Sequence, residues 1–178
     1  MDQQVIRFWF EEILPAQWWD KDPAFDQQIR DRFGAVHRQG ARCELYGWRT
    51  SPLGRLAEII VLDQFSRNMF RNSPQAFAHD PLALALAQEA IASGADQELS
   101  QAERNFLYMP FMHSESLSIH EIAVRLFEKN GLESALEYEL KHRAIIERFG
   151  RYPHRNAILG RKSTTEELFF IRNKGSGF

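Results

Sequence analysis

The sequence predicts an all-α protein, one compact domain of about eight helices arranged as antiparallel hairpins. Two observations lead to this fold class. Apolar residues recur at helical spacing along most of the 178 residues, and three such segments open with a capping residue followed by proline, at Asp22-Pro23, Ser51-Pro52 and Asp80-Pro81. No segment alternates apolar and polar residues between turn signals, so no strand is expected.

The first fifty residues predict two helices. Residues 3–12 are expected to form a short helix with an aromatic face, followed by an irregular connector at residues 15–19. A longer helix is expected from Pro23 to about Tyr46, because apolar residues recur there every three or four positions.

The segment Ser51–Arg71 is predicted to be one continuous helix at the centre of the fold. It is apolar nearly all round, which is typical of a buried helix. Asp63 and Arg67 lie one turn apart within its apolar face. Because a lone buried charge is costly, these two residues indicate either a buried ion pair or the floor of a polar pocket.

The second half of the chain predicts five helices. The first runs from Asp80-Pro81 to Ser93-Gly94, and the next begins at a Ser100/Glu103 capping box and is expected to break at Pro110. Residues 116–129 and 132–149 follow, the latter stopped by Gly150, and Thr164 with Glu167 caps a short last helix. We expect a single domain over residues 1–171 and a frayed tail over 172–178.

Composition excludes several classes of protein. A net charge of −2 argues against a surface devoted to nucleic acid, and a single cysteine, Cys43, excludes an internal disulfide and thiolate metal sites. A free thiol suits a reducing compartment. The N-terminus lacks the features of a signal peptide, and no apolar run is long enough to span a bilayer. A cytoplasmic protein is therefore expected, without a membrane partner.

Charged residues mark two further regions. Glu139 and Arg143 repeat the pattern of Asp63 and Arg67, and both pairs are open to a structural or a functional interpretation. Between positions 141 and 162 there are five arginines and two lysines against one acid. Arginine and histidine fixed around a helix end suit a phosphate or carboxylate, although the same arginines could instead bind helix-end carbonyls.

His113 and Glu115 follow the expected break at Pro110, where they could supply acid–base groups or metal ligands. No histidine or acid pair has the spacing of a known metal motif, and no phosphate-binding or dinucleotide-binding glycine pattern is present. We therefore predict neither a metal nor a cofactor.

Five motifs, FWF, LDQFSRNMFR, YMPFMHSE, RFGRYPHRN and LGRKSTTEE, occur in this order between about Val5 and Phe170. Together they resemble bacterial domain-of-unknown-function family 924. The resemblance implies a tetratricopeptide-like α–α superhelix and no established activity, substrate or cofactor.

The leading hypothesis is a pocket that binds a small anionic ligand through a phosphate or carboxylate. Its candidate ligand-binding residues are Asp63, Arg67, Asn68, Arg71, Glu115, Arg148, Arg151, Arg155 and Asn156, and the candidates for proton transfer are His113, His142 and His154. One alternative is a scaffold that holds a peptide or protein in a groove lined by Trp18, Trp19 and Trp48. A third is RNA or DNA binding by the basic C-terminal segment. Enzyme activity, ligand identity and oligomeric state remain open at this stage.

Overall fold

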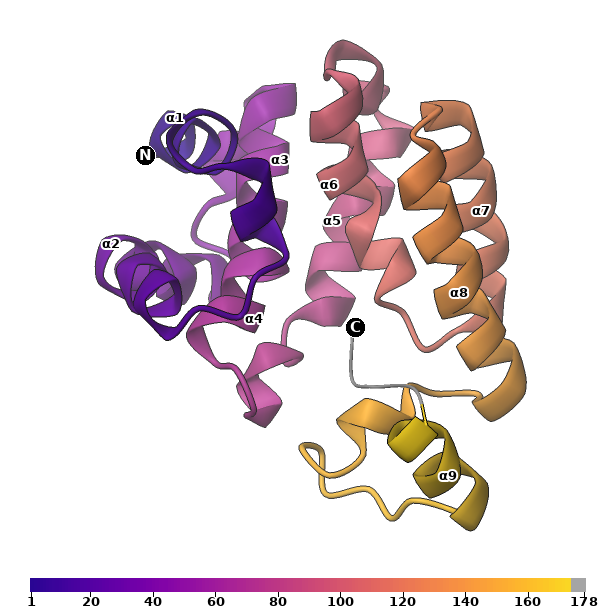
Figure 1. Ribbon diagram of the computed structural model, residues 1–178. Coiled ribbons are helices and arrows are strands. Elements are labelled where there is room, and N and C mark those ends of the chain that lie inside the picture. Colours follow the sequence, from indigo (N-terminus) through magenta and orange to yellow (C-terminus); the bar gives the residue numbers. More distant parts are fainter. Residues whose placement is uncertain (174–178) are drawn as a thin grey trace.

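The computed structural model describes residues 1–173, and within this range it contains helices and turns but no strand (Figure 1). The all-α prediction is confirmed. The α-helices are α1 (Asp2–Arg7), α2 (Pro23–Ala41), α3 (Pro52–Leu62), α4 (Gln64–Met69), α5 (Asp80–Ala92), α6 (Gln101–Met112), α7 (Leu117–Asn130), α8 (Glu133–Phe149) and α9 (Thr165–Asn173). Short turns of other helix types are η1 (Phe8–Glu12), η2 (Pro15–Trp18), η3 (Tyr46–Thr50), η4 (Pro74–Ala76), η5 (Ala95–Glu98) and η6 (Pro153–Arg155).

Helices that follow one another along the chain pack side by side. The contacts run from α3 to α5, α5 to α6, α6 to α7 and α7 to α8, while α1, α2 and α4 cover α3. Figure 1 shows α9 and the loop before it below the lower ends of these helices. This stacking of antiparallel neighbours is compatible with the tetratricopeptide-like topology that the family resemblance implies.

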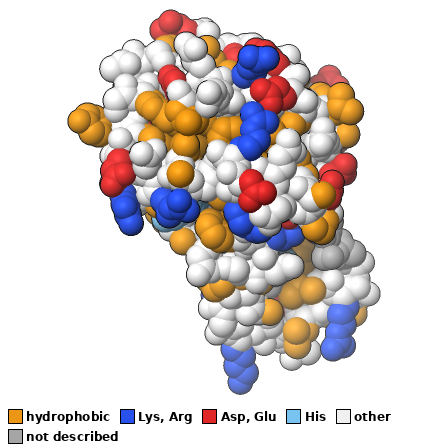
Figure 2. All heavy atoms as spheres, turned by 90° about the vertical axis from the view of Figure 1, so that its left-hand side faces the viewer, with side chains coloured by type: hydrophobic (Ala, Val, Ile, Leu, Met, Phe, Trp, Pro, Cys, Tyr) orange, Lys and Arg blue, Asp and Glu red, His pale blue; other side chains and the backbone are white. Residues whose placement is uncertain are grey.

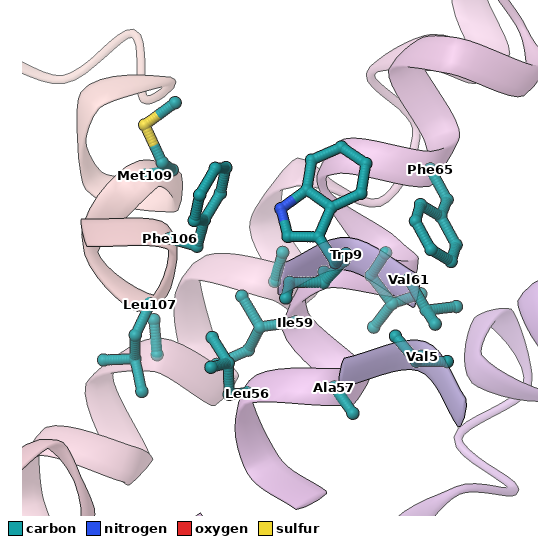
Figure 3. Close-up of a cluster of buried hydrophobic side chains, with 14 of the residues drawn as sticks. Val5, Trp9, Leu56, Ala57, Ile59, Val61, Phe65, Phe106, Leu107 and Met109 are labelled. Atoms are coloured by element: carbon teal, nitrogen blue, oxygen red, sulfur yellow. The ribbon is translucent and has the colours of Figure 1, made fainter. Parts of the chain in front are cut away.

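An aromatic core joins the first helices to α6. The Trp9 ring is fully buried and meets the rings of Phe65 and Phe106 edge-on, with centroids 5.6 and 5.5 Å away (Figure 3). Edge-to-face pairs of this kind add about 0.5–1.5 kcal/mol each to the burial of the rings. A smaller apolar cluster contains Ile146 and Tyr152, and Phe170 of α9 packs against it.

The predicted continuous helix over residues 51–71 is wrong, because the chain breaks at Asp63 between α3 and α4. The Arg67 guanidinium donates to the Asp63 carbonyl at 3.0 Å, while the backbone hydrogen bond from Arg67 to the same carbonyl is stretched to 3.4 Å. A side chain that competes for a helix carbonyl is a recognised cause of a helix break.

Two other predicted helix ends are also wrong. Pro110 lies inside α6, which continues to Met112 because the N–H of His113 still donates to the Met109 carbonyl at 3.0 Å. Helix α2 ends at Ala41 rather than near Tyr46, since the chain turns through a left-handed residue at Cys43, with φ of 58°.

Several other helix ends follow the predicted signals, but the start of α5 does not. Ser100 and Glu103 form a capping box, and Gly150 ends α8 with φ of 67°, a left-handed conformation that suits glycine. Asp80 does not cap α5, because its carboxylate turns away to arginine side chains. Of the predicted frayed tail, Arg172 and Asn173 belong to α9 and residues 174–178 lie outside the described range.

The surface around α1 and α2 carries apolar, acidic and basic side chains intermixed, as Figure 2 shows. Across residues 1–173, no helix combines the length and the apolar character needed to cross a membrane.

Candidate functional site

A buried aspartate and a histidine meet at the lower ends of the helices. Asp63 lies at the break between α3 and α4 and is 1% exposed, and His113 follows the last residue of α6. The His113 Nδ1 atom is 2.7 Å from Asp63 Oδ1. Gln64 Nε2 donates to Asp63 Oδ2 at 2.5 Å, so both carboxylate oxygens are engaged. The helix break and the end of α6 therefore create a fixed carboxylate–imidazole pair.

Two arginines extend this pair through a second carboxylate. Arg67 Nη1 lies 2.9 Å from Asp63 Oδ1, which confirms the ion pair predicted from their spacing. The Arg67 fork also donates to both oxygens of Asp80, at 3.0 Å each. Arg155 Nη1 donates to Asp80 Oδ2 at 3.2 Å, and its Nη2 donates to the His113 carbonyl at 3.0 Å. We call Asp63, Arg67, Asp80, His113 and Arg155 the central network.

The surroundings of Asp63 and His113 determine the protonation state of each side chain. Burial would raise the pKa of Asp63, but Arg67, His113 and Gln64 together lower it to about 2, so the carboxylate is charged. Burial, and then Arg67, lower the pKa of His113 below 6.5 despite Asp63, so this ring is neutral near pH 7. Because Asp63 accepts the proton on Nδ1, the His113 Nε2 atom carries a lone pair. No residue in the described range hydrogen-bonds to that atom.

Aromatic rings form one side of the network. The Arg155 guanidinium lies 4.5 Å from the Phe77 ring centroid and 4.7 Å from that of Tyr152, positions in which a cation is attracted to the ring face. His142 and His154 also adjoin Tyr152, with ring centroids 5.7 and 5.5 Å away. Burial is the main cause that lowers the pKa of His142 to about 3 and of His154 to about 4, so both are neutral near pH 7.

The second predicted intrahelical pair does not form. Glu139 instead lies 2.7 Å from His120 of α7, and both side chains are fully buried. Arg143 Nε and Glu139 Oε2 are buried without a hydrogen-bond partner within residues 1–173. Glu139 faces the neighbouring helix rather than the next turn of its own, so helical spacing alone could not identify its partner.

The remaining basic residues are dispersed rather than gathered. Arg148 and Arg151 pair with Glu166 and Glu167 of α9, each at 2.7 Å. Arg161 donates two hydrogen bonds to the Glu115 carboxylate, from Nη1 at 2.6 Å and from Nη2 at 2.9 Å. In the same way Arg71 and Asn68 both bond Asp26 of α2, and Asn156 bonds Ser163 and Arg161.

Of the predicted ligand-binding residues, the network unites Asp63, Arg67 and Arg155, with His113 from the candidates for proton transfer. Sequence reasoning missed Asp80, which it interpreted as a helix cap, together with the stacking rings Phe77 and Tyr152. The signal that could have identified Asp80 is the need of Arg67 for a second carboxylate.

Two hollows of the surface lie away from the central network. One small hollow of about 30 Å³ is lined by Tyr108 and Lys129 among others, and another of about 210 Å³ lies at the turn between α7 and α8. Neither is lined by the central network. Within residues 1–173, no three His, Cys, Asp or Glu side chains are placed to hold a metal ion.

Comparison with known proteins places the chain in a family. Residues 5–175 match the family described as "Bacterial protein of unknown function (DUF924)". A solved structure, the protein of unknown function ATU0120 from Agrobacterium tumefaciens, is 42% identical and superposes with a TM-score of 0.91 over 96% of each chain. No curated protein matches the sequence. The chain therefore belongs to the DUF924 family of bacterial proteins.

Proposed function

We propose that this protein binds a small anionic molecule at the central network, and that His113 accepts a proton from it or from a bound water. The observation that supports this proposal most strongly is the Asp63–His113 pair. A buried carboxylate orients a neutral imidazole through Nδ1 at 2.7 Å and leaves Nε2 without a partner in the described range. A histidine held in this way is suited to general-base chemistry.

The arginines supply the affinity for an anion. The Arg67 side chain is 20% exposed and that of Arg155 only 7%, so both guanidinium groups are largely shielded from solvent. Charge-assisted hydrogen bonds are roughly twice as strong as neutral ones, and a planar guanidinium holds a carboxylate or phosphate through two parallel N–H groups. Such donors would also stabilise negative charge that develops when His113 removes a proton.

The other hypotheses receive less support from the side chains. Trp18 and Trp19 pack against Phe106, with ring centroids 4.9 and 5.9 Å away, so both rings belong to an aromatic cluster, in which Trp19 is 57% exposed. The arginines of the basic segment are paired with carboxylates, which lowers the positive potential available to a nucleic acid.

The proposal is tested by titrating small anions, including formate, propionate and inorganic phosphate, while following thermal unfolding. An anion at about a hundred times its dissociation constant stabilises a protein by about 2.7 kcal/mol. We expect stabilisation of the parent protein that is lost in Arg155→Gln. The control Arg148→Gln removes an arginine from the last turn of α8 whose partner is the exposed Glu166, and it should keep the response.

Because Arg155→Gln could destabilise the fold by itself, the ring nitrogens of His113 are also followed by NMR in the parent protein. A bound anion should shift His113 Nε2 far more than the ring of His37, since His37 bonds Ser66 and, within residues 1–173, no hydrogen bond joins it to a residue of the network. Equal stabilisation of the parent and Arg155→Gln, with no change at His113, would contradict the proposal.

A further inference from the structure

The Asp80 carboxylate occupies the position in which the two arginines of the network would hold an anionic ligand. Three N–H groups converge on it, two from Arg67 at 3.0 Å and one from Arg155 at 3.2 Å. These arginines belong to distant segments, α4 and η6, and Asp80 is the first residue of α5. Donors from two elements thus meet at a single carboxylate.

The charge balance of the network determines whether an additional anion can bind while Asp80 is in place. Asp63 and Asp80 are balanced by Arg67 and Arg155, and His113 is neutral, so the network carries no net charge near pH 7. An additional anion would bring an uncompensated charge into a largely buried site, which is costly. An anion therefore binds favourably only when one of the two carboxylates leaves.

Asp80 is the carboxylate that can leave. Asp63 is 1% exposed and is held by His113, Gln64 and Arg67 together. Asp80 is 15% exposed, and within residues 1–173 its side chain bonds only the two arginines. Its departure would cost α5 no side-chain cap, because the residue before the helix, His79, makes none and Asp80 itself makes none.

We propose that Asp80 is an internal substitute for the carboxylate of a small carboxylic-acid ligand, which replaces it on Arg67 and Arg155. This inference rests on the proposed function and specifies its ligand class. When Asp80 leaves, the network has one net positive charge, which matches a monoanionic carboxylate. A phosphate dianion would leave the site with a net negative charge, so it is the poorer ligand.

The test is calorimetric titration of propionate, with inorganic phosphate as a second arm, into the parent protein and Asp80→Asn. The apparent dissociation constant equals the intrinsic one divided by the fraction of molecules in which the site is free. If Asp80 occupies the arginines nine times in ten, its neutralisation should tighten propionate binding about tenfold. We expect a smaller gain for phosphate.

A matched control is Asp26→Asn. It removes a carboxylate that accepts two hydrogen bonds from one guanidinium group, that of Arg71, at 2.6 and 2.7 Å. Only one guanidinium is freed there, so we expect no comparable gain in propionate binding. An equal gain in both variants would mean that any unpaired arginine of this protein binds carboxylates, and the inference would be overturned.

A measurement on the parent protein covers the case in which Asp80→Asn does not fold. The side-chain carboxyl ¹³C resonance of Asp80 should move towards that of a solvent-exposed aspartate as propionate is added, while that of Asp63 stays in place. Propionate binding with an unchanged Asp80 resonance, or binding that Asp80→Asn weakens, would overturn the inference and leave the proposed function standing. An absence of anion binding in both proteins would overturn the proposed function itself.

Discussion

Replacement of Asp63 by asparagine tests the electrostatic core of the site, because it removes one negative charge while keeping the shape of the side chain. The carboxylate forms an ion pair with Arg67 at 2.9 Å and shares hydrogen bonds with His113 and Gln64, at 2.7 and 2.5 Å. Its removal leaves Arg67 with Asp80 as its sole acidic partner in the described range.

The magnitude follows from the pKa of Asp63 and from its burial. Lowering this pKa from 3.8 to about 2 corresponds to about 2 kcal/mol of folding free energy at about 1.36 kcal/mol per pH unit. Removing one partner of a buried ion pair typically costs about 3–5 kcal/mol. We therefore expect Asp63→Asn to lower the free energy of unfolding by about 2–5 kcal/mol at pH 7.

The sign of the pH dependence is also determined. A carboxylate whose pKa is lower in the folded state stabilises the fold above its unfolded pKa, and this stabilisation is lost as the pH falls through the folded value. The part of the difference between the parent protein and Asp63→Asn that comes from the Asp63 charge itself should thus be constant from pH 7 to about 4 and should shrink between pH 3.8 and about 2.

Urea denaturation at a series of pH values measures this difference. Asp31→Asn is the control, since Asp31 is exposed and, within residues 1–173, bonds only Gln27 of its own helix. Such surface changes usually fall within about 0.5 kcal/mol. An Asp63→Asn protein as stable as this control, or a difference that does not change with pH, would refute the reasoning.

Three further predictions concern the rest of the fold. Burial lowers the pKa of His37 to about 4, so this residue should destabilise the protein by up to about 3 kcal/mol as the pH falls from 6.5 to 4, and urea denaturation of His37→Gln should lack that contribution. Phe106→Ala should cost about 3–5 kcal/mol in thermal or urea unfolding, because it empties the centre of the aromatic core. Gly54→Ala should be strongly destabilising by the same assay, since an added Cβ would lie 2.0 Å from the Trp48 carbonyl oxygen, whereas Gly47→Ala meets no atom within 4 Å and serves as its control.

Local signals in the sequence were sufficient to predict most of the fold. The capping box at Ser100 and the glycine at position 150 act within one helix turn, so their structural effect can be seen without knowing the neighbouring helices. Pro110 shows the limit of such a signal. It removes one hydrogen-bond donor, but the surrounding packing keeps α6 helical as far as Met112.

The candidate site could be predicted only in part, because its pairings depend on packing between distant segments. Asp63 and Arg67 are four residues apart, and their ion pair follows from helix geometry. Glu139 has the same spacing from Arg143 but pairs with His120, nineteen positions away, because α7 packs against α8. Asp80 joins Arg67 and Arg155 over 13 and 75 positions, a link that only the folded chain reveals.

The proposed function requires His113 to be a neutral base that Asp63 holds beside an anion site. The most direct test is a ¹⁵N NMR measurement of the His113 ring nitrogens at pH 7, before and after addition of propionate. We expect a protonated Nδ1, an unprotonated Nε2, and a shift of Nε2 when propionate binds. A doubly protonated ring or a proton on Nε2 in the free protein, together with no response to propionate, would contradict it.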